Sequence, residues 1–116
     1  MRTIVAGSRT IDRYSYVASA IAEAPWVITE ILSGGAHGVD EFGEAYAHFN
    51  RIPLKMMNSH WNTMESFDPD IGRKRNIEMV ESADALVAVW DGKSRGTAHM
   101  IEIAKEKGLL VHVKKI

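Results

Sequence analysis

Short apolar runs alternate along the chain with longer stretches in which apolar residues recur at helical spacing. An apolar run bounded by turn residues predicts a buried strand, and apolar residues every three to four positions predict an amphipathic helix. The expected strands are residues 3–6, 27–32, 53–57, 85–90 and 109–113. The expected helices are residues 14–24, 39–50, 70–82 and 98–107.

This alternation of strands and helices predicts an α/β fold. Strands that are apolar along their whole length, with helices between them, are typical of a parallel sheet covered on both faces. Because the connections in such a sheet are right-handed, few topologies remain, and we expect the strand order 3-2-1-4-5. The prediction is a single domain over residues 1–116: a three-layer α/β/α Rossmann-like fold with a five-stranded parallel sheet.

Several residues indicate where the expected helices begin and end, and which face is buried. Asp12 is the expected N-cap of the first helix. Gly108 is expected to close the last helix, as a glycine at a helix C-terminus commonly does. The second helix is expected to bury one face, which carries Val39, Phe42, Tyr46 and Phe49.

The stretch from Ser33 to Asp40, which reads SGGAHGVD, joins a predicted strand to a predicted helix. Its three glycines let the backbone take positive φ values and let another group approach closely. The first amides of the following helix have no partner within it, so such a turn suits an anion such as phosphate. The alternative interpretation is a tight turn whose glycines only pack the helix on the sheet.

Two further turns fall at the same edge of the expected sheet. Gly7-Ser8-Arg9 follows the first strand, and the stretch 91–97, DGKSRGT, follows the fourth. Between these two strands the sheet order reverses, and open α/β sheets bind ligands at such a point. Three converging turns rich in Gly, Ser and basic residues therefore predict a phosphate-binding surface. Neither the Gly-x-Gly-x-x-Gly dinucleotide pattern nor the P-loop pattern is present.

Composition narrows the classes of function. The 116 residues carry a formal net charge of −1 and no cysteine, which excludes disulfides and thiolate metal sites and argues against a broad nucleic-acid binder. The histidines lack metal-ligand spacing, so we expect no metal site and no cofactor. No apolar run approaches the roughly 20 residues of a membrane span. With no signal-peptide pattern either, we expect a cytoplasmic protein without a membrane partner.

Together, five motifs resemble the SLOG superfamily, and most closely its branch of proteins related to YspA and YpsA. The motifs are Gly7-Ser8-Arg9, Ser33-Gly-Gly-Ala-His-Gly-Val-Asp40, Arg75-Asn76-x-x-Met79, Ala83-Asp84 and Trp90-Asp-Gly-x-Ser-Arg-Gly-Thr97. The resemblance implies a Rossmann-like fold that binds a nucleotide or nucleotide-derived ligand through these turns, as a sensor or sequestering module. Because larger relatives associate, we also expect a homo-oligomer.

The residues expected to bind the ligand belong to these motifs and to the irregular stretch at 58–69. They are Gly7, Ser8, Arg9, Ser33, Gly34, Gly35, Ala36, His37, Gly38, Asp40, Trp61, Arg75, Asn76, Asp91, Gly92, Ser94, Arg95, Gly96 and Thr97. Arg9 and Arg95 are expected to neutralise phosphate, because a guanidinium matches phosphate in a bidentate way. Trp61 is the candidate for stacking on a base, whereas Trp90 is expected to belong to the core.

The superfamily also contains the Lonely-guy phosphoribohydrolases, whose Gly-Gly-x-Gly-Thr-x-x-Glu motif supplies a catalytic glutamate. Here Gly96 and Thr97 match, but Met100 stands at the glutamate position. An enzyme of this kind would be a nucleotide N-glycosidic hydrolase with another carboxylate. The candidates are Asp40, Asp91 and Glu102, with Arg73 or Arg75 as the assisting arginine. A third alternative, a single-stranded DNA binder like DprA, needs a basic aromatic groove, and the near-neutral charge counts against it.

Overall fold

The computed structural model describes residues 1–36, 38–57 and 71–116, in which strands and helices alternate. The elements are β1 (Arg2–Gly7), α1 (Tyr14–Glu23), β2 (Glu30–Ser33), α2 (Val39–Phe49), β3 (Leu54–Met56), α3 (Ile71–Ser82), β4 (Ala85–Trp90), α4 (Arg95–Glu106) and β5 (Leu110–Lys115). His37 and Trp61 lie outside the described residues, so the roles expected of these two side chains stay predictions.

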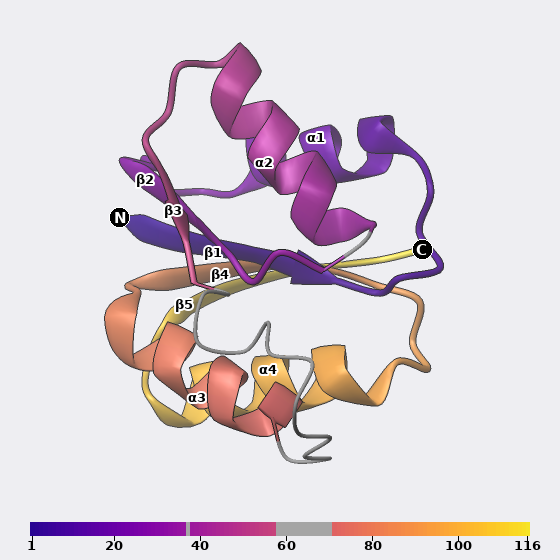
Figure 1. Ribbon diagram of the computed structural model, residues 1–116, viewed down its shortest axis with the longest axis vertical. Helices are drawn as coiled ribbons and strands as arrows, with labels where there is room; N and C mark the ends of the chain where they lie inside the picture. Colours follow the sequence, from indigo (N-terminus) through magenta and orange to yellow (C-terminus); the bar gives the residue numbers. More distant parts are fainter. Residues whose placement is uncertain (37, 58–70) are drawn as a thin grey trace, which may run out of the picture.

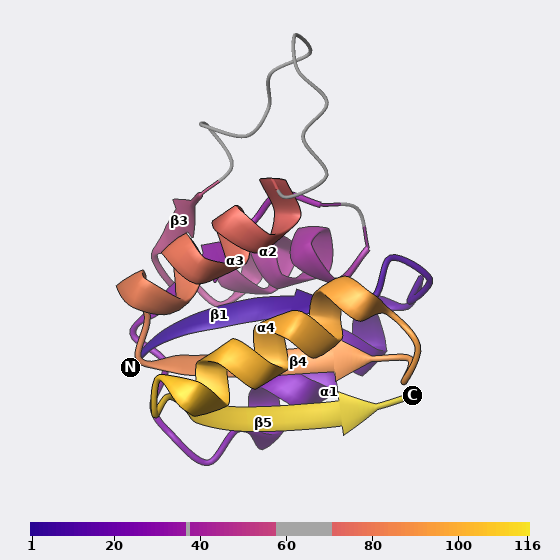
Figure 2. The ribbon, with the colours of Figure 1, turned by 90° about the horizontal axis from the view of Figure 1, so that it is seen from below.

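All five strands run parallel in the order β3-β2-β1-β4-β5, which confirms the predicted topology. At the centre, β1 pairs with β4 from Thr3 opposite Ala85 to Gly7 opposite Val89. The chain moves outward from β1 to β3 on one side and from β4 to β5 on the other, so the order reverses between β1 and β4. In Figure 2 the arrowheads of β1, β4 and β5 point toward one edge, at which α4 begins.

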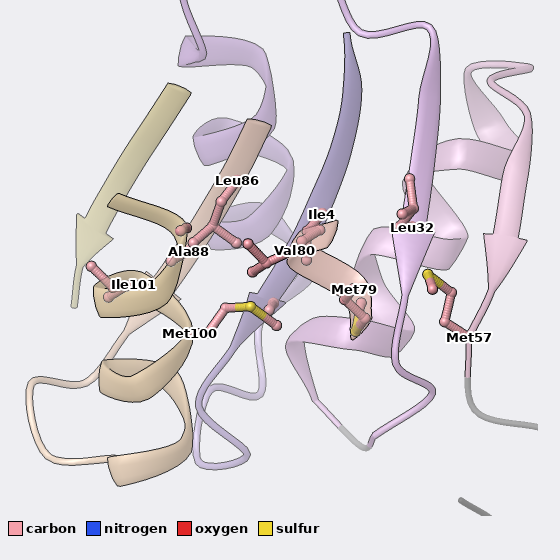
Figure 3. Packing of buried hydrophobic residues seen from close by; sticks show 11 residues of the cluster. Ile4, Leu32, Met57, Met79, Val80, Leu86, Ala88, Met100 and Ile101 are labelled. Atoms are coloured by element: carbon pink, nitrogen blue, oxygen red, sulfur yellow. The ribbon is translucent and has the colours of Figure 1, made fainter. Parts of the chain in front are cut away.

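The helices form two layers, with α1 and α2 on one face of the sheet and α3 and α4 on the other (Figure 1). Successive side chains of a strand point to opposite faces. Ile4 and Leu86 therefore pack toward α3 and α4 (Figure 3), whereas Val5 and Val87 pack toward α1 and α2. Because both faces are covered, the two central strands are apolar along most of their length.

The outer strands depart from the prediction of buried runs. β2 begins at Glu30 rather than at Val27, whose side chain is 77% exposed. Its neighbour β1 begins at Arg2, opposite Glu30, so the residues before Glu30 have hardly any backbone to pair with. β3 lies at the edge of the sheet, and Leu54 and Met56 are each 41% exposed there.

Helix details were also partly mispredicted. The residue at the N-cap position of α1 is Arg13, not Asp12, and its side chain makes no capping hydrogen bond. On α2, Phe49 is 71% exposed, because a helix advances about 100° per residue and this position turns away from the buried arc of Val39, Gly43 and Ala47. Gly108, with φ of 78°, directly follows the C-cap residue of α4, as predicted.

A close helix-to-sheet contact at Gly43 allows a test of this packing. A Cβ on Gly43 would stand 2.8 Å from Val5 Cγ1, whereas a Cβ on Gly72, also in a helix, would meet no atom within 4 Å among the residues that the structure describes. Gly43→Ala should lower the free energy of unfolding by about 1–2 kcal/mol, because overpacking outweighs the gain in helix propensity. Urea unfolding monitored by circular dichroism measures this.

Gly72→Ala is the matched control, since the same change there meets open space. Its free energy of unfolding should stay unchanged or rise by up to about 1 kcal/mol. Equal stability of the two variants would contradict the contact between α2 and β1.

Candidate functional site

A cavity of about 610 Å³ lies at the edge of the sheet where β1 and β4 end. Its walls come from the turns after β1, β2 and β4 and from the starts of α3 and α4, so the three predicted turns do converge. The lining residues are Ala6, Gly7, Arg9, Thr10, Ala36, Asp40, Gly72, Arg73, Arg75, Asn76, Met79, Asp91, Lys93, Ser94, Arg95, Gly96, Thr97, His99 and Met100.

The turn after β1 is held against β4. A Cβ on Gly7 would stand 2.1 Å from the Val89 carbonyl oxygen, so no larger residue fits there. The Ser8 amide donates a hydrogen bond to that same oxygen at 3.1 Å, and Ser8 Oγ accepts one from the Asp91 amide at 3.1 Å. Ser8 is 1% exposed, so its side chain joins the two turns from behind rather than reaching the cavity.

Asp91 organises the turn between β4 and α4. Its Oδ1 accepts hydrogen bonds from the amides of Lys93 and Ser94, both at 2.8 Å, and its Oδ2 accepts one from Thr10 Oγ1 at 2.9 Å. The two amides hold the pKa of this carboxyl at about 2, so Asp91 stays ionised at neutral pH. Gly92 supplies the positive φ of 81° that the turn requires.

The start of α4 leaves its first amides open. Ser94 is at the N-cap position, but its side chain makes no capping hydrogen bond, and its Oγ lies 3.2 Å from Thr97 Oγ1 instead. A Cβ on Gly96 would meet no atom of the described residues within 4 Å, so none of them stands in front of this turn of backbone. Uncapped amides at a helix N-terminus suit an anion. The turn between β4 and α4 is shorter than the predicted stretch 91–97, because α4 already begins at Arg95.

The glycine turn after β2 is held by side chains behind it. Ser33 Oγ accepts a hydrogen bond from the Gly35 amide at 3.1 Å and donates one to Glu44 Oε2 at 2.6 Å. Asp40 Oδ2 accepts one from the Ala36 amide at 3.3 Å. Of the described residues in this turn, Ala36 and Asp40 line the cavity, whereas its glycines shape the backbone.

Gly34 lies between a side chain of α2 and a side chain of α3. A Cβ there would stand 3.0 Å from Asp40 Oδ2 and 3.2 Å from Arg75 Nε. A side chain at this position would therefore separate the carboxyl group from the guanidinium.

Asp40 is a carboxyl group with an altered pKa. The residue is 6% exposed, and burial raises its pKa from 3.8 to about 6, with a small further increase from Glu44. The Ala36 amide and the Arg75 guanidinium act in the opposite direction and offset part of the burial effect. Asp40 therefore changes its charge near pH 6, whereas Asp91 does not.

On α3, Arg75 and Asn76 connect the cavity to two other elements. Arg75 Nη1 donates to the Gly34 carbonyl oxygen at 3.4 Å, and its buried Nε has no hydrogen-bond partner within residues 1–36, 38–57 and 71–116. Asn76 Nδ2 donates to the Gly96 carbonyl oxygen at 3.1 Å and to His99 Nδ1 at 3.2 Å. With Asn76 as donor, His99 Nδ1 is an acceptor, so the proton of the neutral ring lies on Nε2.

The structure divides the predicted ligand-binding residues into two sets. Those that line the cavity are Gly7, Arg9, Ala36, Asp40, Arg75, Asn76, Asp91, Ser94, Arg95, Gly96 and Thr97. Those that support the turns from outside its lining are Ser8, Ser33, Gly34, Gly35, Gly38 and Gly92. Trp90 packs partly buried against the core, as predicted, and its Nε1 donates to the Ser94 carbonyl oxygen at 3.1 Å.

Sequence reasoning did not single out Thr10, Gly72, Lys93 or Glu44. Lys93 lies inside the recognised turn 91–97, and Thr10 directly follows Gly7-Ser8-Arg9. Their positions in or beside these motifs could have identified them as residues of the site. Glu44 is one helical turn after Asp40, but only the fold shows that it reaches Ser33. Met100, at the position of the expected glutamate, is 2% exposed and belongs to the core (Figure 3).

Comparisons of the chain with protein-family models, with curated proteins and with solved structures found no match. The resemblance to the SLOG superfamily stays a prediction based on the motifs. Among the described residues, no group of three or more His, Asp or Glu side chains is placed to hold a metal ion. In the same part of the chain, no helix has the length and apolar character needed to cross a membrane.

The raised pKa of Asp40 gives the stability of the protein a defined pH dependence. Between pH 4 and pH 6 the folded state binds more protons at this site than the unfolded state, so the stabilising contribution of protonated Asp40 is complete below about pH 4 and is lost as pH rises through 6. Relative to Asp40→Asn, the native protein should lose on the order of 3 kcal/mol between pH 4 and pH 7.

Urea unfolding of both proteins across this pH range measures the difference. Glu44→Gln serves as a control background. In this background, the pH-dependent difference in the free energy of unfolding that Asp40→Asn causes should persist with a smaller amplitude. A difference that does not change with pH would contradict the burial of an ionisable Asp40.

Proposed function

We propose that the protein binds a nucleotide or nucleotide-derived ligand in this cavity, as a sensor or sequestering module of the SLOG type. One observation carries the proposal: five basic side chains surround a cavity at the point where the sheet order reverses. They are Arg9, Arg73, Arg75, Lys93 and Arg95. Parallel α/β sheets bind ligands at this place, and the cavity volume of about 610 Å³ falls within the range of small-molecule sites.

The phosphate of the ligand is placed at the start of α4. There the amides of residues 95–97 are uncapped, and Gly96 allows a phosphate oxygen to come close to the backbone. Lys93 and Arg95 flank this position and would neutralise its charge. The Asp91 carboxylate is held in its turn and does not replace the phosphate as the partner of these cations, since its oxygens already accept three hydrogen bonds.

The rest of the ligand extends toward α3. Asn76 and His99 line the cavity on that side, and the almost fully buried Met79 and Met100 form part of its apolar floor. A mixture of a few fixed polar groups and apolar surface is typical of small-molecule sites.

Loss of the Arg95 charge should weaken binding. Arg95→Gln is expected to lower the affinity for a phosphorylated nucleotide about tenfold or more, because a charge-assisted hydrogen bond contributes about 1.5–3 kcal/mol. Isothermal titration calorimetry with AMP, ADP, ADP-ribose and NAD at low ionic strength measures the affinity.

Lys105→Gln is the matched control. Lys105 is an exposed residue of the last turn of α4, outside the cavity, and its substitution changes the net charge by the same amount. Its affinity should stay within about twofold of the native protein at these salt concentrations. Absence of binding for the whole panel, or equal affinities in the two variants, would refute the proposed site.

One observation favours a second candidate function, a nucleotide N-glycosidic hydrolase. Of the three carboxylates considered, Glu102 is exposed and does not line the cavity, and Asp91 is occupied by its turn. Asp40 lines the cavity, and its pKa of about 6 lies near that of an effective general acid at neutral pH. In such a reaction the carboxyl proton of Asp40 goes to the leaving base as its bond to the anomeric carbon breaks, water adds to that carbon, and the proton that the water loses returns to the Asp40 carboxylate.

If this second function holds, Asp40→Asn should abolish base release while binding persists. A general acid contributes about 10²–10⁴-fold to a rate, so turnover should fall by at least 100-fold. Chromatography of nucleoside monophosphates incubated with the native protein detects the free base. Binding without any base release by the native protein would leave the sensor or sequestering function and remove the hydrolase.

A further inference from the structure

The five basic side chains occupy two separate walls of the cavity. Arg73 and Arg75 come from the first turns of α3, whereas Arg9, Lys93 and Arg95 come from the turns after β1 and β4 and from the start of α4. One phosphate at the start of α4 accounts for the second group. It does not involve the arginines of α3, of which Arg75 acts electrostatically on Asp40 and donates a hydrogen bond to the Gly34 carbonyl oxygen.

The cations on the α3 wall are placed unfavourably unless an anion is present. The first turn of α3 carries Arg73 and no acidic residue, although positive charge opposes the dipole at a helix N-terminus. Within the described ranges, only the Gly34 carbonyl oxygen accepts a hydrogen bond from the Arg75 guanidinium, at a long 3.4 Å. The buried Arg75 Nε has no partner at all in this part of the chain. A guanidinium left so incompletely bonded beside a cavity is costly.

Basic side chains away from the cavity, by contrast, form ion pairs with acidic side chains. Lys114 Nζ lies 2.7 Å from Glu23 Oε1, and Arg2 Nε lies 3.7 Å from Asp84 Oδ2. Around the cavity, by comparison, the side chains of Arg73 and Arg95 make no hydrogen bond or ion pair with any other described residue.

The acidic residues of the cavity do not cancel this charge. Among the described lining residues, five basic and two acidic side chains give a formal charge of +3, although the whole chain carries −1. Both acids, Asp40 and Asp91, accept hydrogen bonds from backbone amides of their own turns. A single phosphate monoester carries only about −2 at neutral pH.

From this arrangement we propose that the ligand carries two phosphate groups, one bound at the start of α4 and the other by Arg73 and Arg75 on the α3 wall. This inference rests on the proposed function and defines its ligand class. Gly72 adds no side chain at the start of α3, and a Cβ there would meet no atom of the described residues within 4 Å. The two phosphates are either linked, as in a nucleoside diphosphate, or carried on different sugar oxygens.

The test is calorimetric titration of the full chain with AMP, ADP and adenosine 3′,5′-bisphosphate. The native protein should bind at least one of the two-phosphate nucleotides tenfold or more tightly than AMP, and the better of the two shows how the phosphates are spaced. Arg73→Gln should weaken the two-phosphate nucleotide at least tenfold and weaken AMP much less, so that most of this advantage is lost. Arg95→Gln should weaken all three ligands, because it removes a contact of the shared phosphate.

The control Lys105→Gln separates a specific contact from the general effect of net charge, and it should preserve the advantage of the two-phosphate nucleotide. The inference is overturned if AMP binds as tightly as both two-phosphate nucleotides, or if Arg73→Gln weakens AMP and the two-phosphate nucleotides equally. Either result leaves the proposed function intact. Failure of all three nucleotides to bind would instead overturn the proposed function and this inference with it.

Discussion

The close approach of β1 to β4 at Gly7 and Ser8 is the contact on which the cavity depends. The missing side chain of Gly7 lets the backbone reach the Val89 carbonyl oxygen, and Ser8 then binds both that oxygen and the Asp91 amide. Through Asp91, the same contact fixes the turn that leads into α4. A larger residue at Gly7 would move the two central strands apart at the edge where α4 begins.

Asn76 joins the α3 wall of the cavity to the wall formed by the start of α4. Its amide reaches from α3 to the Gly96 carbonyl oxygen and to His99, both on α4, so the starts of the two helices are positioned relative to each other. On the opposite side, Asp40 and Arg75 approach each other across Gly34. The cavity is thus assembled from four segments far apart in the sequence, and each of them is tied to a neighbour by polar side chains.

Much of the fold could be predicted, because central strands covered on both faces leave a continuous apolar pattern, and right-handed connections then restrict the strand order. The pattern failed at Val27 and at Phe49, which are apolar but exposed. Hydrophobicity alone does not show where the partner of a strand ends, as at Val27, or how wide the buried arc of a helix is, as at Phe49. In the site, the turns were identified from glycine and serine. The roles of Ser33 and Glu44 were not, because a hydrogen bond between a strand and the second turn of a helix exists only once both are packed.

The three hydrogen bonds accepted by Asp91 also decide where the entropic cost of binding falls. Because they hold the turn before α4 in one conformation, a ligand does not have to order that backbone. The arginines and the lysine around the cavity are different, since each long side chain loses about 0.5–1.5 kcal/mol of rotamer freedom when it closes on an anion. Selectivity among anions would therefore be set by how many of these side chains a ligand can immobilise, and not by any rearrangement of this turn.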